Sequence, residues 1–225
     1  MSNPLENRPR GIIFDLDGTL LDTEPLYSEA TQKVLDPFGH IYSLELKKRC
    51  MGGDSRVGAQ MTIDEYDLPM TVDEYLSARN VYLLELFPTS PEIHGAGEFV
   101  TALAAKKIPM GLATSSHKHL CDIKLSNKGW GSSFRSIVCG DNPAVKRGKP
   151  EPDIFLACAE LINIPASHCI AFEDSPTGIK AARAAGMRVV GINSQYVELA
   201  DLHEADIIID NYLELLPFII SWPDE

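Results

Sequence analysis

The sequence predicts an α/β fold: a Rossmann-like, doubly wound parallel sheet that is interrupted early by an all-helical insertion. Short apolar segments alternate with helical patterns from about Gly95 onward, and this alternation is typical of parallel sheets covered by helices. An earlier apolar segment, Gly11 to Phe14, has the composition of a strand that is buried on both faces. Between these regions, residues 24–85 contain only helical patterns. Because this insertion follows the first strand directly, we expect a cap over the carboxyl end of that strand.

The individual elements follow from apolar periodicity and from the residues that break it. In the insertion, Gly39, Gly52-Gly53 and Leu68-Pro69 separate the helical patterns. Helices are predicted there at residues 26–38, 44–51, 56–66 and 72–87. After it, helices are predicted at 98–107, 118–128, 153–162 and 177–185, and strands at 109–113, 136–140, 169–172, 189–192 and 207–209, before an apolar C-terminal helix. We therefore assign residues 1–22 and 93–225 to the α/β core and residues 23–92 to the helical cap.

The composition is that of one globular chain that is long enough to bury a full core, with 225 residues of which 44% are hydrophobic. A net charge of −12 argues against binding to nucleic acid or to an anionic membrane. No segment reaches transmembrane length or has the pattern of a signal peptide. The five cysteines are scattered, without a C-x-x-C motif, as in proteins with reduced core cysteines. We expect a cytoplasmic monomer.

Two aspartates follow the first predicted strand directly, in the segment Asp15-Leu16-Asp17-Gly18-Thr19. In open α/β sheets, ligands bind at the carboxyl ends of the strands. Buried carboxylates at such a position are costly unless a metal or other cations compensate. Gly18 permits a sharp turn in which backbone N–H groups can converge on an anion. One acid could attack while the other moves protons around a divalent ion; the structural alternative is an Asp-Gly turn.

Three more polar clusters lie where predicted strands end or predicted helices begin. The hydroxyls of Thr114-Ser115-Ser116 can donate to a phosphate. Lys149, which is followed by two prolines at a helix entrance, can neutralise an anion. Glu173-Asp174 offers the oxygen ligands that Mg²⁺ prefers. Each cluster alone has a structural alternative, a helix N-cap or a surface lysine, but together they match phosphoryl transfer through an aspartyl intermediate.

These motifs resemble those of the haloacid dehalogenase superfamily of phosphohydrolases. Its four motifs occur in order as Asp15-x-Asp17-Gly18-Thr19, Thr114, Lys149 and Glu173-Asp174. The sequence around them is similar to the group of pseudouridine-5′-phosphatases and glycerol-3-phosphatases. The resemblance implies a Mg²⁺-dependent phosphatase that hydrolyses a small phosphomonoester, such as pseudouridine 5′-phosphate, glycerol 3-phosphate or a sugar phosphate.

The resemblance also implies roles for the acidic residues. Asp15 would attack phosphorus and carry the phosphoryl group. Asp17 would protonate the leaving oxygen and then activate the water that hydrolyses the intermediate. Mg²⁺ would be held by the Asp15 carboxylate, the Asp17 backbone carbonyl and Asp174, with Glu173 as a ligand or a supporting neighbour. The residues that would bind the phosphate are Gly18, Thr19, Thr114, Ser115 and Lys149.

Two departures from the similar group concern the substrate. Thr19 stands where the group usually carries leucine. The similar group tends to carry basic residues after Met-Gly in the cap, but here the stretch is Met51-Gly52-Gly53-Asp54-Ser55-Arg56, so a basic contact is lost or moved. Gly52 and Arg56 are therefore candidate specificity residues, and Glu24 is a third because it lies at the entrance to the cap, although Glu24 and Arg56 could equally serve as helix-start residues.

Three alternative functions compete with this assignment. A sugar-phosphate mutase of the same superfamily shares every core motif, and the core sequence alone does not separate it from a phosphatase. A dehalogenase needs neither the acid at Asp17 nor the pair Glu173-Asp174. A non-catalytic phosphate-binding protein would be expected to have lost at least one motif, and all four are present.

Overall fold

The computed structural model describes residues 4–50 and 55–223. The chain divides into two compact units. The α/β unit consists of Met1–Asp22 and Pro91–Glu225, and the helical unit consists of Thr23–Ser90. No helix in the described residues is long and apolar enough to cross a membrane.

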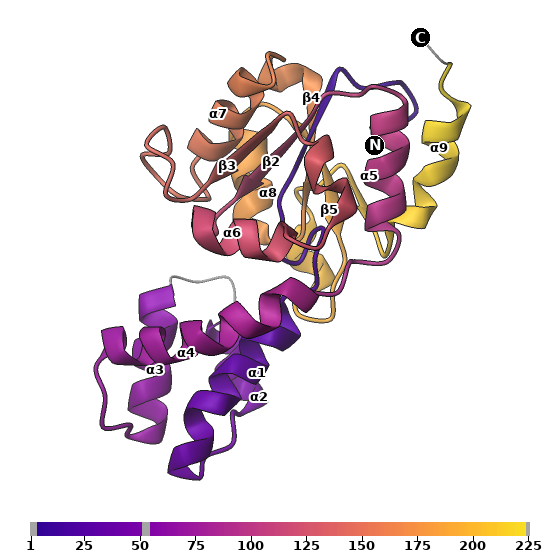
Figure 1. The fold of residues 1–225 in the computed structure, drawn as a ribbon. Coiled ribbons are helices and arrows are strands. Elements are labelled where there is room, and N and C mark those ends of the chain that lie inside the picture. Colours follow the sequence, from indigo (N-terminus) through magenta and orange to yellow (C-terminus); the bar gives the residue numbers. More distant parts are fainter. Residues whose placement is uncertain (1–3, 51–54, 224–225) are drawn as a thin grey trace. The chain divides into compact units, whose positions relative to one another are not determined.

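The strands of the α/β unit form one parallel sheet of six strands (Figure 1), in the order β3-β2-β1-β4-β5-β6. Their bounds are β1 Gly11–Phe14, β2 Met110–Thr114, β3 Ser136–Cys139, β4 Cys169–Glu173, β5 Arg188–Ile192 and β6 Ile207–Ile209. The first strand in sequence is thus central, with β2 and β4 as its neighbours. The sheet confirms the predicted α/β fold.

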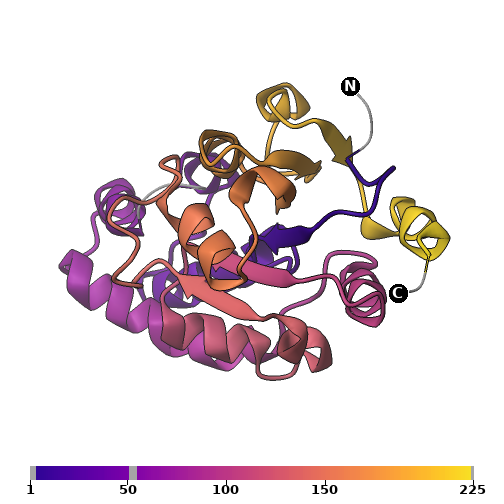
Figure 2. The ribbon, with the colours of Figure 1, turned by 90° about the horizontal axis from the view of Figure 1, so that it is seen from above.

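Helices cover both faces of this sheet (Figures 1 and 2). Their bounds are α5 Ala96–Ala105, α6 Lys118–Leu125, α7 Asp153–Leu161, α8 Pro176–Ala184 and α9 Leu216–Ser221. Side chains of β1 alternate between two hydrophobic clusters, because successive residues of a strand point to opposite faces. Ile12 and Phe14 pack in the cluster that includes α5, α6 and α9 residues, and Ile13 packs with α7 and α8 residues.

Short 3₁₀ helices follow or precede several of these elements, and some predicted bounds differ slightly from the observed ones. The 3₁₀ helices are η3 Gly129–Ser133, η4 Ala166–His168, η5 Leu199–Leu202 and η6 Tyr212–Glu214. The helix predicted to run to residue 128, for example, ends at Leu125, and η3 begins at Gly129.

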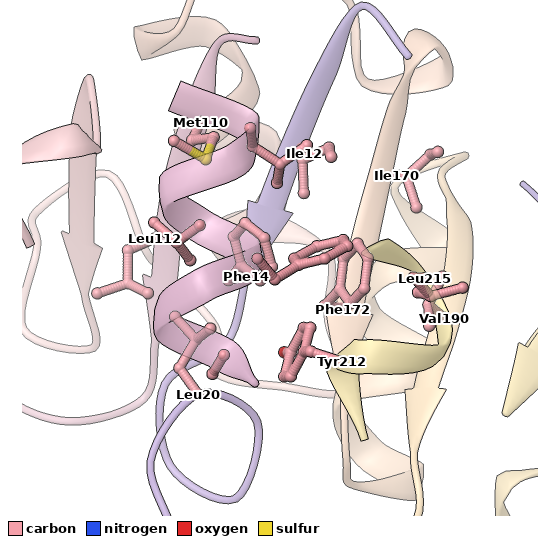
Figure 3. Packing of buried hydrophobic residues seen from close by; sticks show 14 of the residues in the cluster. Ile12, Phe14, Leu20, Met110, Leu112, Ile170, Phe172, Val190, Tyr212 and Leu215 are labelled. Atoms are coloured by element: carbon pink, nitrogen blue, oxygen red, sulfur yellow. The ribbon is translucent and has the colours of Figure 1, made fainter. Parts of the chain in front are cut away.

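An aromatic cluster under the centre of the sheet supports the strand ends (Figure 3). Phe14 and Phe172 are stacked with ring centroids 4.8 Å apart, and Phe172 stacks in turn on Tyr212 at 5.7 Å. The buried Tyr212 hydroxyl donates to the backbone carbonyl of Thr19 at 3.1 Å. Because Phe14 precedes Asp15 and Phe172 precedes Glu173, this packing fixes the backbone from which both acids project.

The helical unit is built from four α-helices within its described residues. Their bounds are α1 Glu24–Leu35, α2 Leu44–Cys50, α3 Ser55–Tyr66 and α4 Val72–Leu86, with the 3₁₀ helices η1 Asp36–Phe38 and η2 Phe87–Thr89. Residues such as Leu35, Ile63 and Tyr75 form its own hydrophobic core. A capping box formed by Thr71 and Glu74 starts α4.

Candidate active site

The carboxyl ends of the three central strands bring the predicted acidic and hydroxyl residues to one edge of the sheet. Asp15 is the first residue after β1, Thr114 ends β2 and Glu173 ends β4. The backbone N–H of Asp15 donates to the Phe172 carbonyl at 3.0 Å. Phe14 is in register with Leu112 on one side and with Phe172 on the other. Parallel strands in this register place the three motifs at one height, where open α/β sheets bind ligands.

Lys149 lies between two acids of this edge. Its Nζ is 2.5 Å from Asp15 Oδ1 and 2.6 Å from Glu173 Oε1. All three side chains are nearly inaccessible to solvent, with exposed fractions of 7%, 9% and 1%. The structural alternative of a surface lysine in a proline-rich turn is therefore wrong. Burial alone would lower the pKa of Lys149, but the carboxylates of Asp15 and Glu173 raise it above its ordinary value.

Glu173 is held from both sides. Its Oε1 contacts Lys149, and its Oε2 accepts hydrogen bonds from the N–H and the hydroxyl of Ser175, each at 3.0 Å. Ser175 also caps α8, because its hydroxyl oxygen accepts from the Gly178 N–H at 3.0 Å. The N-cap that the sequence offers as an alternative thus exists at Ser175. With both oxygens engaged, Glu173 is better placed to orient Lys149 than to bind a metal directly.

Asp174 is oriented by the turn after β1. The Thr19 hydroxyl donates to Asp174 Oδ1 at 3.0 Å. Gly18 has a φ of +82°, and a Cβ there would overlap the Asp174 carboxylate, so only glycine fits. The Gly18 N–H donates to the Leu21 carbonyl at 2.7 Å. Gly18 and Thr19 therefore shape the turn and position Asp174, and their direct binding of phosphate remains a prediction.

The acids at this edge repel one another. Burial, together with the charges of Glu173 and Asp17, raises the pKa of Asp15 from 3.8 to about 7, although Lys149 acts in the opposite direction. Burial and the charges of Glu173 and Asp15 also raise the pKa of Asp174 well above 3.8. A cation beside Asp15 and Asp174 would favour their charged forms.

The same residues fit a Mg²⁺ site. In the described part of the chain, no group of three or more His, Cys, Asp or Glu side chains is arranged to hold a metal alone. Mg²⁺, however, usually takes one or two carboxylates and completes its shell with waters and substrate phosphate. Two buried carboxylates with raised pKa values meet that requirement.

Residues that follow β2 contact both oxygens of the Asp17 carboxylate. The Ser116 hydroxyl donates to Asp17 Oδ2 at 2.7 Å, and Lys124 Nζ lies 2.5 Å from Asp17 Oδ1. Lys124 also donates to the Ser116 hydroxyl oxygen at 2.9 Å. Its side chain is fully buried, whereas that of Asp17 is 26% exposed. The alternative that Ser116 caps the following helix is wrong, because His117 occupies that position without a side-chain cap.

Sequence reasoning missed Lys124 altogether. A signal was nevertheless present, because Lys124 follows Cys121 by three residues and so lies on the same face of a predicted helix. Both side chains are fully buried on α6. Lys124 could have been recognised as a candidate, because it is a lysine on the apolar face of a helix that directly follows a cluster of hydroxyl residues.

The remaining core candidates are Thr114 and Ser115. Thr114 is fully buried, and its Oγ1 accepts the Ser116 N–H at 3.1 Å, which leaves its O–H hydrogen to be donated elsewhere. Ser115 is exposed. Both roles in phosphate binding remain predictions.

Of the three specificity candidates, two lie in the described part of the helical unit. Glu24 is the first residue of α1 and is partly buried. Arg56 lies in the first turn of α3, and its Nη1 is 2.6 Å from Asp73 Oδ1, with exposed fractions of 62% and 77%. Gly52 lies outside the described residues.

Comparisons with known proteins agree with this arrangement. A family model described as haloacid dehalogenase-like hydrolase matches residues 12–192. A Drosophila melanogaster protein provisionally assigned as a pseudouridine-5′-phosphatase is 38% identical over 194 residues, which is 84% of either chain. The (DL)-glycerol-3-phosphatase 2 of Arabidopsis thaliana is 34% identical over 228 residues, covering 96% of this chain and 95% of the relative.

A solved structure shares the fold over nearly the whole length. The crystal structure of a Thermotoga maritima protein provisionally assigned as a beta-phosphoglucomutase superposes with a TM-score of 0.82 at 29% identity. The match covers 95% of this chain and 100% of that chain.

Proposed function

The chain belongs to the haloacid dehalogenase-like hydrolase family, and from this premise we propose that it hydrolyses a small phosphomonoester with Asp15 as the nucleophile. Its phosphatase relatives make it a phosphoric monoester hydrolase. The observation that carries the proposal is the buried contact of Lys149 with both Asp15 and Glu173. A positive charge beside an Asp15 carboxylate oxygen supports the proposal, because the negative charge of a phosphate would be received there.

The two aspartates divide the chemistry. Asp15 attacks phosphorus as the bond from phosphorus to the leaving oxygen breaks, and Asp17 gives its proton to that oxygen. Asp17 then takes a proton from water as the water oxygen attacks the phosphorus of the aspartyl phosphate. The bond between phosphorus and Asp15 breaks in this step, which releases phosphate. Thr114 and Lys149 bind the oxygens of the transferring group.

Mg²⁺ would be held by the carboxylates of Asp15 and Asp174 and by the Asp17 backbone carbonyl, with Glu173 in a supporting role. When bound, it would neutralise the combined charge of the acids and the phosphate. The raised pKa values of Asp15 and Asp174 support this assignment, because burial and the neighbouring carboxylates both disfavour their charged forms and a bound cation would offset this.

Removal of Mg²⁺ is expected to stop hydrolysis, because the acids would then repel the phosphate. The measurement is the rate of phosphate release from p-nitrophenyl phosphate in excess EDTA, followed by titration with Mg²⁺. Asp174→Asn should raise the Mg²⁺ concentration that is needed for half-maximal rate, and the exposed Asp122→Asn provides a matched control. Full activity in EDTA, with no response to added metal, would contradict the assignment.

The substrate class is best tested by a screen of phosphate release. We expect activity on several small esters, and the screen should include pseudouridine 5′-phosphate, glycerol 3-phosphate and sugar phosphates. A mutase is the second candidate, because a solved structure with that provisional assignment shares the fold. With a sugar phosphate, a phosphatase releases inorganic phosphate in proportion to substrate lost, whereas a mutase yields an isomeric sugar phosphate instead.

We further propose that the helical unit is a cap whose side chains meet the leaving group. Its insertion between Asp22 and Pro91, just after the turn that holds Asp15 and Asp17, supports this role. Such a cap would exclude water from the reaction and select the substrate, while the core motifs bind the phosphate.

Arg56 is the nearest cation to the departure in the cap sequence, and we expect Arg56→Ala to change the ranking of substrates. A lost charged contact is worth about 1.5–3 kcal/mol, or roughly 10–150-fold in kcat/KM, for the affected ester only. The rate on p-nitrophenyl phosphate should change little. Arg49→Ala is the matched control, because Arg49 is also partly exposed and pairs with Glu65 in the same unit. A uniform change across four or five esters, or no change, would show that Arg56 does not select the substrate.

A further inference from the structure

Lys124 is a buried cation that folding alone explains poorly. Its side chain is completely inaccessible to solvent, and its Nζ contacts Asp17 Oδ1 and the Ser116 hydroxyl. Removing an ammonium group from water is costly, and a well-packed apolar residue of similar volume is often equally stable in its place. Asp17 does not require the contact for its own solvation, because a quarter of its side chain is exposed.

Lys124 contacts Asp17, the residue that carries out both proton transfers in the proposed function. Asp17 must place one carboxyl oxygen first at the leaving group and later at the attacking water. Its two oxygens are each fixed, Oδ2 by the Ser116 hydroxyl at 2.7 Å and Oδ1 by Lys124 at 2.5 Å. The contact between Lys124 and Ser116 closes a triangle of three groups. Such a triangle leaves the carboxylate little freedom to rotate.

We propose that Lys124 is a positioning residue that fixes the orientation of the Asp17 carboxylate for proton transfer. The inference rests on the proposed function, since it needs Asp17 to be the acid and base. Lys124 itself touches neither substrate nor phosphate in this scheme. It acts from α6, the helix of the α/β unit that follows the loop containing Ser116.

The size of the effect follows from the geometry that proton transfer requires. Catalytic groups must be held close to their productive positions, and a displacement of 1 Å can cost about 10²-fold in rate. We therefore expect Lys124→Met to lower kcat by about 10²-fold on an alkyl phosphate, with little change in KM. In the first step, measured as the single-turnover rate of leaving-group release, the loss should be much smaller on an aryl phosphate, because an aryl leaving group needs little protonation.

The experiment compares the single-turnover rate of leaving-group release, kcat and KM on glycerol 3-phosphate, or another alkyl ester that the wild type hydrolyses, and on p-nitrophenyl phosphate. The variants are Lys124→Met, Asp17→Asn and the double variant. Lys118→Met is the matched control, because Lys118 is an exposed lysine of the same helix that pairs with Asp122. We expect Lys124→Met to reproduce the ester preference of Asp17→Asn, to add no further loss in the Asp17→Asn background, and Lys118→Met to behave as the wild type.

Other outcomes would overturn the proposal. Equal losses of the single-turnover rate on both esters, or losses that multiply in the double variant, would make Lys124 a structural residue only. If Lys124→Met does not fold, Lys124→Gln, which keeps a hydrogen-bond donor, replaces it in the same experiment. The wild type serves as the check on the proposed function, because its failure to release phosphate from either ester would refute that function whatever the variants do.

Discussion

Asp15→Asn is expected to abolish turnover. Uncatalysed hydrolysis of phosphate monoesters is so slow that enzymes accelerate it by up to about 10²¹-fold. Asp15 is the carboxylate at the end of β1 that contacts Lys149, and its loss removes the proposed nucleophile. Asparagine keeps the shape of the side chain but is a very poor nucleophile. The measurement is steady-state phosphate release by the purified variant, whose folding is checked by circular dichroism.

The control for this variant is Asp122→Asn, which removes an exposed acid of the same unit that pairs with Lys118. It should retain the wild-type rate. More than trace activity in Asp15→Asn would show that the nucleophile is another group, and the roles proposed for the two aspartates would then be wrong.

Asp17→Asn is expected to lower kcat on alkyl esters by about 10²–10⁴-fold, the usual contribution of general acid and base catalysis. The loss in the first step should be smallest for aryl phosphates, because their leaving groups depart without a proton. Binding of Mg²⁺ should persist, since the proposed ligand is the backbone carbonyl of Asp17. The comparison of burst and steady-state rates on both ester types measures these effects, and equal losses on both types in the burst would assign Asp17 another role.

Residues that directly follow apolar strands could be placed from the sequence. Asp15, Thr114 and Glu173 each stand at the end of a short buried run, and the parallel topology brings the ends of adjacent strands to one edge. The position of Lys149 in the site was less easily predicted from the sequence. Lys149 lies in a loop before α7, and its position at a predicted helix entrance grouped it with the other polar clusters; the structure supplied its contacts with Asp15 and Glu173.

Contacts between side chains of separate elements could not be predicted in this way. Lys124 reaches Asp17 from a helix, and a helical lysine is expected to face solvent unless its buried face is recognised. The direction of hydrogen bonds is equally invisible in a sequence. Thr19 follows Asp17 in a motif associated with phosphate binding, yet its hydroxyl donates to Asp174. The pair of Arg56 with Asp73 joins two helices whose relative packing no local pattern specifies.

The central claim is that Asp15 carries the phosphoryl group, and the most direct test is to trap it there. Asp17→Asn should accept phosphate from a radiolabelled aryl ester but lack the base that activates water, so the intermediate should accumulate. After an acid quench and proteolysis, the account predicts label on the peptide that contains Asp15, approaching one phosphate per chain, and none in a variant that also carries Asp15→Asn. Release of the aryl product in a burst without labelled protein, or label that persists without Asp15, would contradict it.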